Sequence, residues 1–149
     1  MGYGNPLRGD DAVGQVVARA FADEPGMDWL ACHQLTPELA ERIAGIDAVV
    51  FVDAAAGQTP GSVAVTELRS SGQPTALAHT ADPPALLGLA RALYGHAPHA
   101  WLVAIGAGSF ELGEGLSEPV AAVVPHAVAV VRGLFRHGRA RPGHPRRDC

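Results

Sequence analysis

Two acidic side chains and one imidazole stand where this chain could most readily carry out chemistry. Asp11, with Asp10 beside it, lies where a glycine-rich N-terminal loop becomes a helix. Asp53 ends the most apolar run of the chain, and His79 lies in a long polar stretch. Two carboxylates and an imidazole form an oxygen and nitrogen donor set that suits a divalent metal ion. The same groups could also serve acid–base hydrolysis.

Each of these residues also has a structural interpretation that requires no catalysis. Asp10 and Asp11 suit a helix cap or the positive end of a helix dipole. Asp53 could end its strand in a turn, although a carboxylate directly after Val49–Val52 is costly to bury without a partner. His79 is one of seven histidines and could be solvated. The residues are more informative together than singly.

Other binding and catalytic motifs are absent from the sequence. The loop Gly2–Gly9 does not follow G-x-G-x-x-G, and the next expected strand ends in His33-Gln34 rather than in an acidic residue. The chain has no Lys and so no phosphate-binding G-K-[ST] motif, and neither H-E-x-x-H nor G-x-S-x-G occurs. A nucleotide-binding domain is therefore the alternative with the least support.

Helices and strands must alternate to position the three residues. Apolar residues at helical spacing predict helices over 11–22, 37–44, 84–94 and 119–136. Thr36 is the expected cap of the second helix, and the last is expected to restart at Pro125. Alternating or continuous apolar runs between turn signals predict strands over 28–35, 48–53, 61–68 and 100–107. Residues 1–10 are expected to form a loop, and 69–83 a long polar connection. Continuous apolar strands between helices predict an α/β fold, a three-layer αβα sandwich around a twisted, mostly parallel sheet. Ligands of such sheets gather beyond the carboxyl ends of the strands.

Composition limits the class of protein. The chain has 149 residues, of which 48% are hydrophobic and 17% charged, as expected for one globular domain. The net charge of −4 argues against a broad nucleic-acid surface. No apolar run reaches about 18 residues, no signal peptide is recognisable, and two Cys form no disulfide framework, so we expect a cytoplasmic protein without a membrane span. The domain is expected over 1–137, followed by a disordered Arg-rich tail over 138–149.

The run Gly2-Tyr3-Gly4-Asn5-Pro6-Leu7-Arg8-Gly9-Asp10-Asp11-Ala12-Val13-Gly14 closely resembles the N-terminal signature of the nickel-iron hydrogenase maturation endopeptidases. Further segments resemble the family's later landmarks in the same order. They are His33–Ala40, Val49–Ala54, His79 with Leu86–Ala90 and Leu93–Gly95, Ser109–Gly113, and Leu116-Ser117. The resemblance covers about residues 2 to 136 and implies a phosphorylase/hydrolase-like sandwich.

The resemblance also implies an activity. Such proteases, described as aspartic-type or metal-dependent, remove a C-terminal extension from the hydrogenase large-subunit precursor after nickel insertion. Nickel in the precursor is the recognition signal, so the metal comes with the substrate and no resident cofactor is expected. The family's metal-contacting and catalytic residues fall on Asp11, Asp53 and His79. The expected partner is the precursor, and the expected oligomeric state is a monomer.

The mechanism stays open at this point. The carboxylates and His79 could grip the substrate's nickel while polarised water attacks the scissile carbonyl. Alternatively, Asp10 or Asp53 could act as the base rather than as a ligand. A non-catalytic factor that binds nickel or the precursor is the alternative of another class.

The abrupt start of the chain departs from the family pattern. The family has an apolar strand ahead of this motif, whereas only Met1 precedes Gly2 here. We therefore expect the usual first strand to be missing or truncated, through a start codon placed too late or a true truncation. Its neighbours would then keep unpaired backbone groups.

Overall fold

The computed structural model describes residues 1–70 and 82–137. Residues 71–81 and 138–149 lie outside the described residues. His79, most of the expected polar connection and the expected Arg-rich tail therefore fall outside them as well, and the predictions made for these segments stay predictions.

Five strands form one sheet in the order β2-β1-β3-β5-β4. The strands are β1 (Gly2–Tyr3), β2 (Ala31–Cys32), β3 (Ala48–Ala55), β4 (Val63–Leu68) and β5 (His99–Gly106). All neighbouring pairs are parallel except β4 and β5, so β4 is an antiparallel edge strand. The predicted fold class and the predicted outer strand are confirmed.

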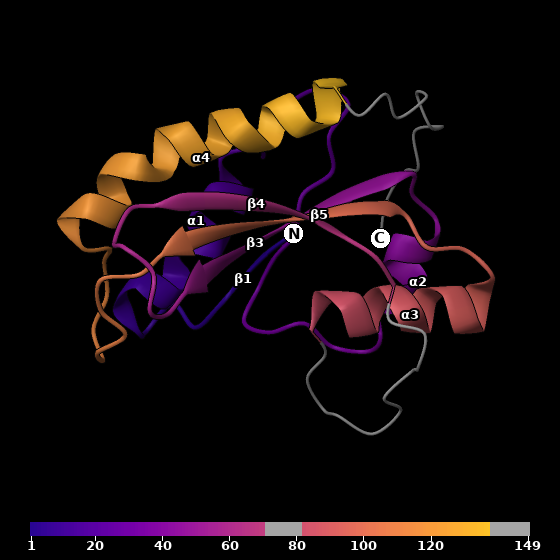
Figure 1. The fold of residues 1–149 in the computed structure, drawn as a ribbon, viewed down its shortest axis with the longest axis horizontal. Coiled ribbons are helices and arrows are strands. Elements are labelled where there is room, and N and C mark those ends of the chain that lie inside the picture. The colour runs from indigo at the N-terminus through magenta and orange to yellow at the C-terminus, as the bar shows by residue number, and fades with distance from the viewer. Residues whose placement is uncertain (71–81, 138–149) are drawn as a thin grey trace.

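Helices cover both faces of the sheet, which makes three layers (Figure 1). The helices are α1 (Val13–Arg19), α2 (Leu39–Ala44), α3 (Pro83–Tyr94) and α4 (Glu118–His137). Successive side chains of β3 alternate between the two faces. Val50 and Val52 pack with α1 and α4, whereas Val49 and Phe51 pack with α2 and α3. This double burial explains why the sequence of β3 is a continuous apolar run.

The helix boundaries correct several expectations. A 3₁₀ turn, Gly9–Ala12, precedes α1, so the α-helix is shorter than the predicted 11–22. Glu38, not Thr36, is the N-cap residue of α2, and no side chain caps that helix. In α3, Asp82 accepts a hydrogen bond from the Ala85 N–H at 2.8 Å. Helix α4 runs unbroken through the exposed Pro125 instead of restarting there.

The N-terminal residues form a strand where a loop was expected. Gly2–Tyr3 lies between β2 and β3, with Gly2 opposite Val52. The Val52 N–H donates to the Met1 carbonyl at 2.8 Å. The register of β5 covers all of β3, whereas that of β1 covers only Val52. Strand β1 is therefore present, and it is two residues long. Because β2 pairs only with this short strand, it shrinks from the predicted 28–35 to two residues.

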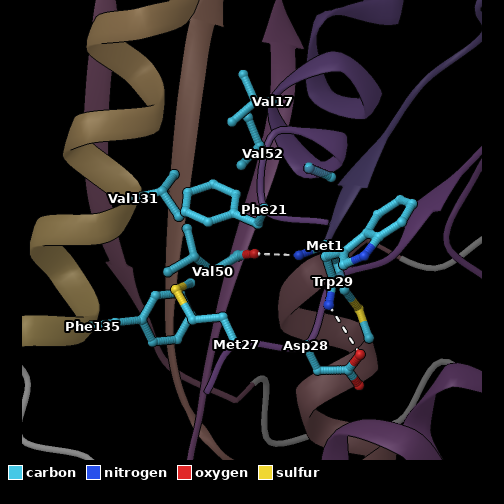
Figure 2. A pocket seen from close by; sticks show the side chains of 11 residues that line it. Met1, Val17, Phe21, Met27, Asp28, Trp29, Val50, Val52, Val131 and Phe135 are labelled. Atoms are coloured by element: carbon cyan, nitrogen blue, oxygen red, sulfur yellow. Dashed lines mark hydrogen bonds between the residues drawn. The ribbon is translucent and has the colours of Figure 1, made fainter. Parts of the chain in front are cut away.

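A small pocket of about 30 Å³ lies beside Met1 (Figure 2). Apolar side chains of α1, α4 and β3, among them Val17, Phe135 and Val50, line it together with Phe21, which follows α1. The N-terminal ammonium of Met1 donates to the Val50 carbonyl at 2.7 Å. Burial lowers the pKa of this ammonium to about 6. The α-amino group of Met1 is thus enclosed by apolar neighbours and loses its proton more readily than an exposed one.

Helix α4 differs from the expectation that no segment could span a membrane. Among the described residues it is the one helix long and apolar enough, by length and composition alone, to do so. This is weak evidence, because a helix that packs on the core of a soluble protein passes the same test. Val120, Ala127 and Val131 of α4 are buried against the sheet, and other apolar residues of the helix, such as Val124 and Val128, pack beside them partly buried.

Candidate functional site

The candidate site lies at the carboxyl ends of β1 and β3, the edge to which the arrowheads of β3 and β5 point in Figure 1. Helix α1, which follows β1, covers one face of the sheet, and α3, which comes after β3 and β4, covers the other. The strand order reverses between β1 and β3, and the crevice outside the carboxyl ends of the strands at such a point is where α/β sheets bind ligands.

Asp11 and Asp53 come together in this crevice. The Asn5 N–H donates to Asp11 Oδ2 at 2.7 Å, which fixes the carboxylate over the end of β1. Asp53 lies within β3 opposite Ala104, two residues before the strand ends, and its side chain is half-buried. The charge of Asp11 contributes to the raised pKa of Asp53, which places the two carboxylates within electrostatic reach.

Asp53 has an unusual affinity for a proton. Its pKa is raised to about 6, chiefly by burial, while hydrogen bonds from the Tyr3 hydroxyl and the Ala54 N–H act in the opposite direction. Burial and the neighbouring charge of Asp53 in turn raise the pKa of the Tyr3 phenol, which keeps it a hydrogen-bond donor. A carboxyl that titrates near neutrality is suited to moving a proton.

The structure describes two members of the expected trio, and their role as a site stays a prediction. His79 lies outside the described residues, so its position relative to the two carboxylates is untested. Within residues 1–70 and 82–137, no three His, Cys, Asp or Glu side chains form a group that could hold a metal ion. Asp11 and Asp53 are two carboxylates within electrostatic reach of each other, a pair that can chemically offer oxygen ligands or an acid and a base.

Asp10 has a different role from its neighbour. Its side chain is 0% exposed, and its carboxylate accepts four hydrogen bonds. The donors are the backbone N–H groups of Gly108, Ser109 and Ser117 and the Ser117 hydroxyl, at 2.7 to 3.0 Å. Burial by itself would raise the pKa of Asp10, but these bonds outweigh it and the pKa is lowered. An enclosed, fully bonded carboxylate is a tether between loops and not an accessible base.

Glycines of the N-terminal motif allow the site to be compact. Gly4 has φ +146°, and a side chain there would collide with the Asp11 backbone. A Cβ on Gly14 would lie 2.7 Å from the Tyr3 carbonyl oxygen and closer still to that of Val52. Helix α1 therefore rests directly on the backbones of β1 and β3, and this brings Asp11 near Asp53.

The sequence analysis missed three contributors to the site. They are Tyr3, Ser117 and Gln15, whose side-chain amide donates to the carbonyls of Gly4 at 2.7 Å and Cys32 at 3.0 Å. Gln15 is 5% exposed, so it locks the end of β1 to β2 from inside the fold. Gln15 lies opposite the apolar positions Val13 and Val17 of the predicted helix, so the sequence pattern gave no signal for its burial.

Known structures share this architecture, whereas no family model and no curated protein matches the chain. The hydrogenase maturating endopeptidase HybD from E. coli is 25% identical, with a TM-score of 0.67 over 93% of this chain and 91% of that one. The [NiFe] hydrogenase maturation protease HycI from Thermococcus kodakarensis is 25% identical, with a TM-score of 0.70 over 91% of this chain and 89% of that one.

A hydrogenase 2 maturation peptidase from Thaumarchaeota archaeon SCGC_AB-539-E09 has the same fold, with 24% identity and a TM-score of 0.66 over 92% of this chain and 95% of that one. The similarity thus extends along nearly the whole length of both partners in each comparison. In fold, and along nearly its whole length, the chain is similar to solved structures named as hydrogenase maturation endopeptidases and proteases.

Proposed function

We propose that this protein is an endopeptidase that removes the C-terminal extension of a nickel-iron hydrogenase large-subunit precursor after nickel insertion. Nickel held by the precursor would be the recognition signal, so the metal belongs to the substrate. The observation that carries the proposal is the meeting of Asp11 and Asp53 at the sheet's crevice, in a fold shared with proteins named as such endopeptidases. We further propose that the protein acts as a cytoplasmic monomer.

The two carboxylates would divide the work according to their surroundings. Asp11 is held by the Asn5 N–H, and we assign it to binding the nickel of the precursor. Asp53, with a pKa of about 6, would accept a proton from the attacking water near neutral pH, or bind nickel as a second oxygen ligand. His79 is the proposed nitrogen ligand, from the family resemblance alone. Carboxylate oxygens and imidazole are ligands that divalent metals accept.

Cleavage of candidate large-subunit precursors, with and without nickel, tests this function. The wild-type protein is expected to shorten the nickel-loaded precursor, as measured by intact mass, and to leave the nickel-free precursor uncut. Asp53→Asn is expected to abolish cleavage. Asp47→Asn is the matched control, because Asp47 is an exposed acid at the amino end of the same strand.

The same experiment separates the protease from a binding factor. A wild-type protein that captures the nickel-loaded precursor in a pull-down without shortening it would favour the non-catalytic maturation factor. If Asp53→Asn cleaves at the wild-type rate, the assignment of Asp53 is wrong.

A further inference from the structure

Two loops at the carboxyl edge of the sheet are joined to each other beside the candidate site. One follows β1 and the other follows β5, and a parallel bridge pairs Arg8 with Gly113. The Gly113 N–H donates to the Leu7 carbonyl at 2.9 Å, and the Gly9 N–H donates to the Gly113 carbonyl at 3.0 Å. The two loops therefore form one continuous rim rather than two independent segments.

This rim exposes large apolar side chains, which we call the apolar lip: Leu7, Phe110 and Leu112. Their exposed fractions are 55%, 36% and 76%. Loops are usually polar. Burying apolar surface stabilises a protein or a complex by about 25 cal/mol for every Å² removed from water, and an exposed apolar side chain does not gain this free energy. Clustered exposed apolar side chains at the edge of a site mark a surface that a partner covers.

Short hydrogen bonds connect the lip to Asp11 and to the buried Asp10. The Leu7 N–H donates to Asn5 Oδ1 at 2.9 Å, and the Asn5 N–H in turn donates to Asp11. On the other loop, Asp10 accepts hydrogen bonds from the Gly108 and Ser109 N–H groups just before Phe110. The lip is thus held in place before any partner arrives, which reduces the entropy lost on binding.

We propose that the apolar lip is the docking surface for apolar side chains of the precursor next to its scissile bond. This inference rests on the proposed function, because it takes the substrate to be a polypeptide whose cut bond reaches Asp11 and Asp53. The rim is linked through Asn5 to Asp11, and it offers a polypeptide apolar side chains flanked by the exposed charges of Arg8 and Glu111. The lip sets affinity, whereas the carboxylates perform the cleavage.

The test compares the double variant Phe110→Ser/Leu112→Ser with the control Leu93→Ser. Leu93 is 63% exposed at the end of α3, near the opposite edge of the sheet. With nickel-loaded precursor, the lip variant is expected to raise KM about tenfold, with kcat within about twofold and an unchanged Tm. The control is expected to change none of the three. A KM that stays at the wild-type value, or rises equally in the control, overturns the proposal.

A direct binding measurement keeps this result separate from the proposed function. If the wild-type protein leaves the precursor uncut, the proposed function fails, and the lip is then judged by the Kd for the same precursor. A Kd about tenfold weaker in the lip variant alone supports the docking surface. An equal Kd in wild type and lip variant refutes it.

Discussion

Replacing Asp10 by Asn removes one charge and one acceptor from the most enclosed polar group of the described residues. In the wild-type protein, Oδ2 accepts three hydrogen bonds and Oδ1 accepts the fourth, from the Ser117 N–H. An Asn side chain can keep its oxygen at the three-donor position, but its amide then faces the Ser117 N–H. Two donors point at each other, and a buried N–H loses its partner.

The cost of this change follows from the number of bonds. An unpaired buried donor costs about 1–3 kcal/mol, and each of the three surviving bonds loses about 1 kcal/mol with the charge. Relief from burying a charge offsets part of this sum. We expect a net loss of about 3 kcal/mol, which lowers Tm by about 6–12 °C in a chain of this size.

Thermal unfolding of wild type, Asp10→Asn and the control Asp47→Asn across pH measures this effect. The pKa of Asp10 is lowered in the fold, so its contribution is fully present above the unfolded value of about 3.9 and is lost as pH falls through the folded value. The gap between wild type and Asp10→Asn is therefore expected to persist down to about pH 4 and to shrink below it. A difference in Tm between wild type and Asp10→Asn under about 2 °C at pH 7, or one that grows in acid, would show that Asp10 does not tether the loops.

Three further predictions concern the site and its framework. Asp53→Asn is expected to keep or raise Tm at pH 7. Burial raises the pKa of Asp53 to about 6, so the wild type loses stability as pH rises from about 4 to 6. Melting curves of both proteins across pH check this. Tyr3→Phe removes a hydrogen bond that lowers that pKa, so the acidic limb of the pH–rate profile is expected to move to higher pH. Gly14→Ala is expected to lower Tm strongly, because its Cβ would collide with the carbonyls of Tyr3 and Val52. The Cβ of Gly133→Ala in α4 meets nothing within 4 Å, so this control is expected to gain about 0.5–1 kcal/mol in the free energy of unfolding. Thermal melting compares the two variants.

The sequence predicted those elements whose patterns are local. The run Ala48–Asp53 is apolar because both faces are covered, and Asp82 and Gly95 bracket α3 as a cap and a left-handed terminus. The nearness of Asp11 and Asp53 followed from one rule, that carboxyl ends of parallel strands share an edge.

The remaining features depend on residues far apart in the chain. The donors that surround Asp10 come from 98 to 107 positions later, so no local pattern distinguishes its role from that of Asp11. Strand β1 is too short to show alternation, and β2 takes its length from β1 rather than from its own sequence. Thr36 has the right residue type for a cap, yet its helix starts later.

The buried α-amino group of Met1 makes local opening of the N-terminal strand measurable by chemical labelling. The sequence has no Lys, so in a protein expressed from Met1 no side chain competes with the α-amino group of Met1 for acylating reagents. In the folded protein this amine is buried and hydrogen-bonded to the Val50 carbonyl. A reagent can therefore acylate it only when β1 separates from β3. The rate of single-site acylation, followed by mass, would therefore report how often β1 opens in otherwise native molecules.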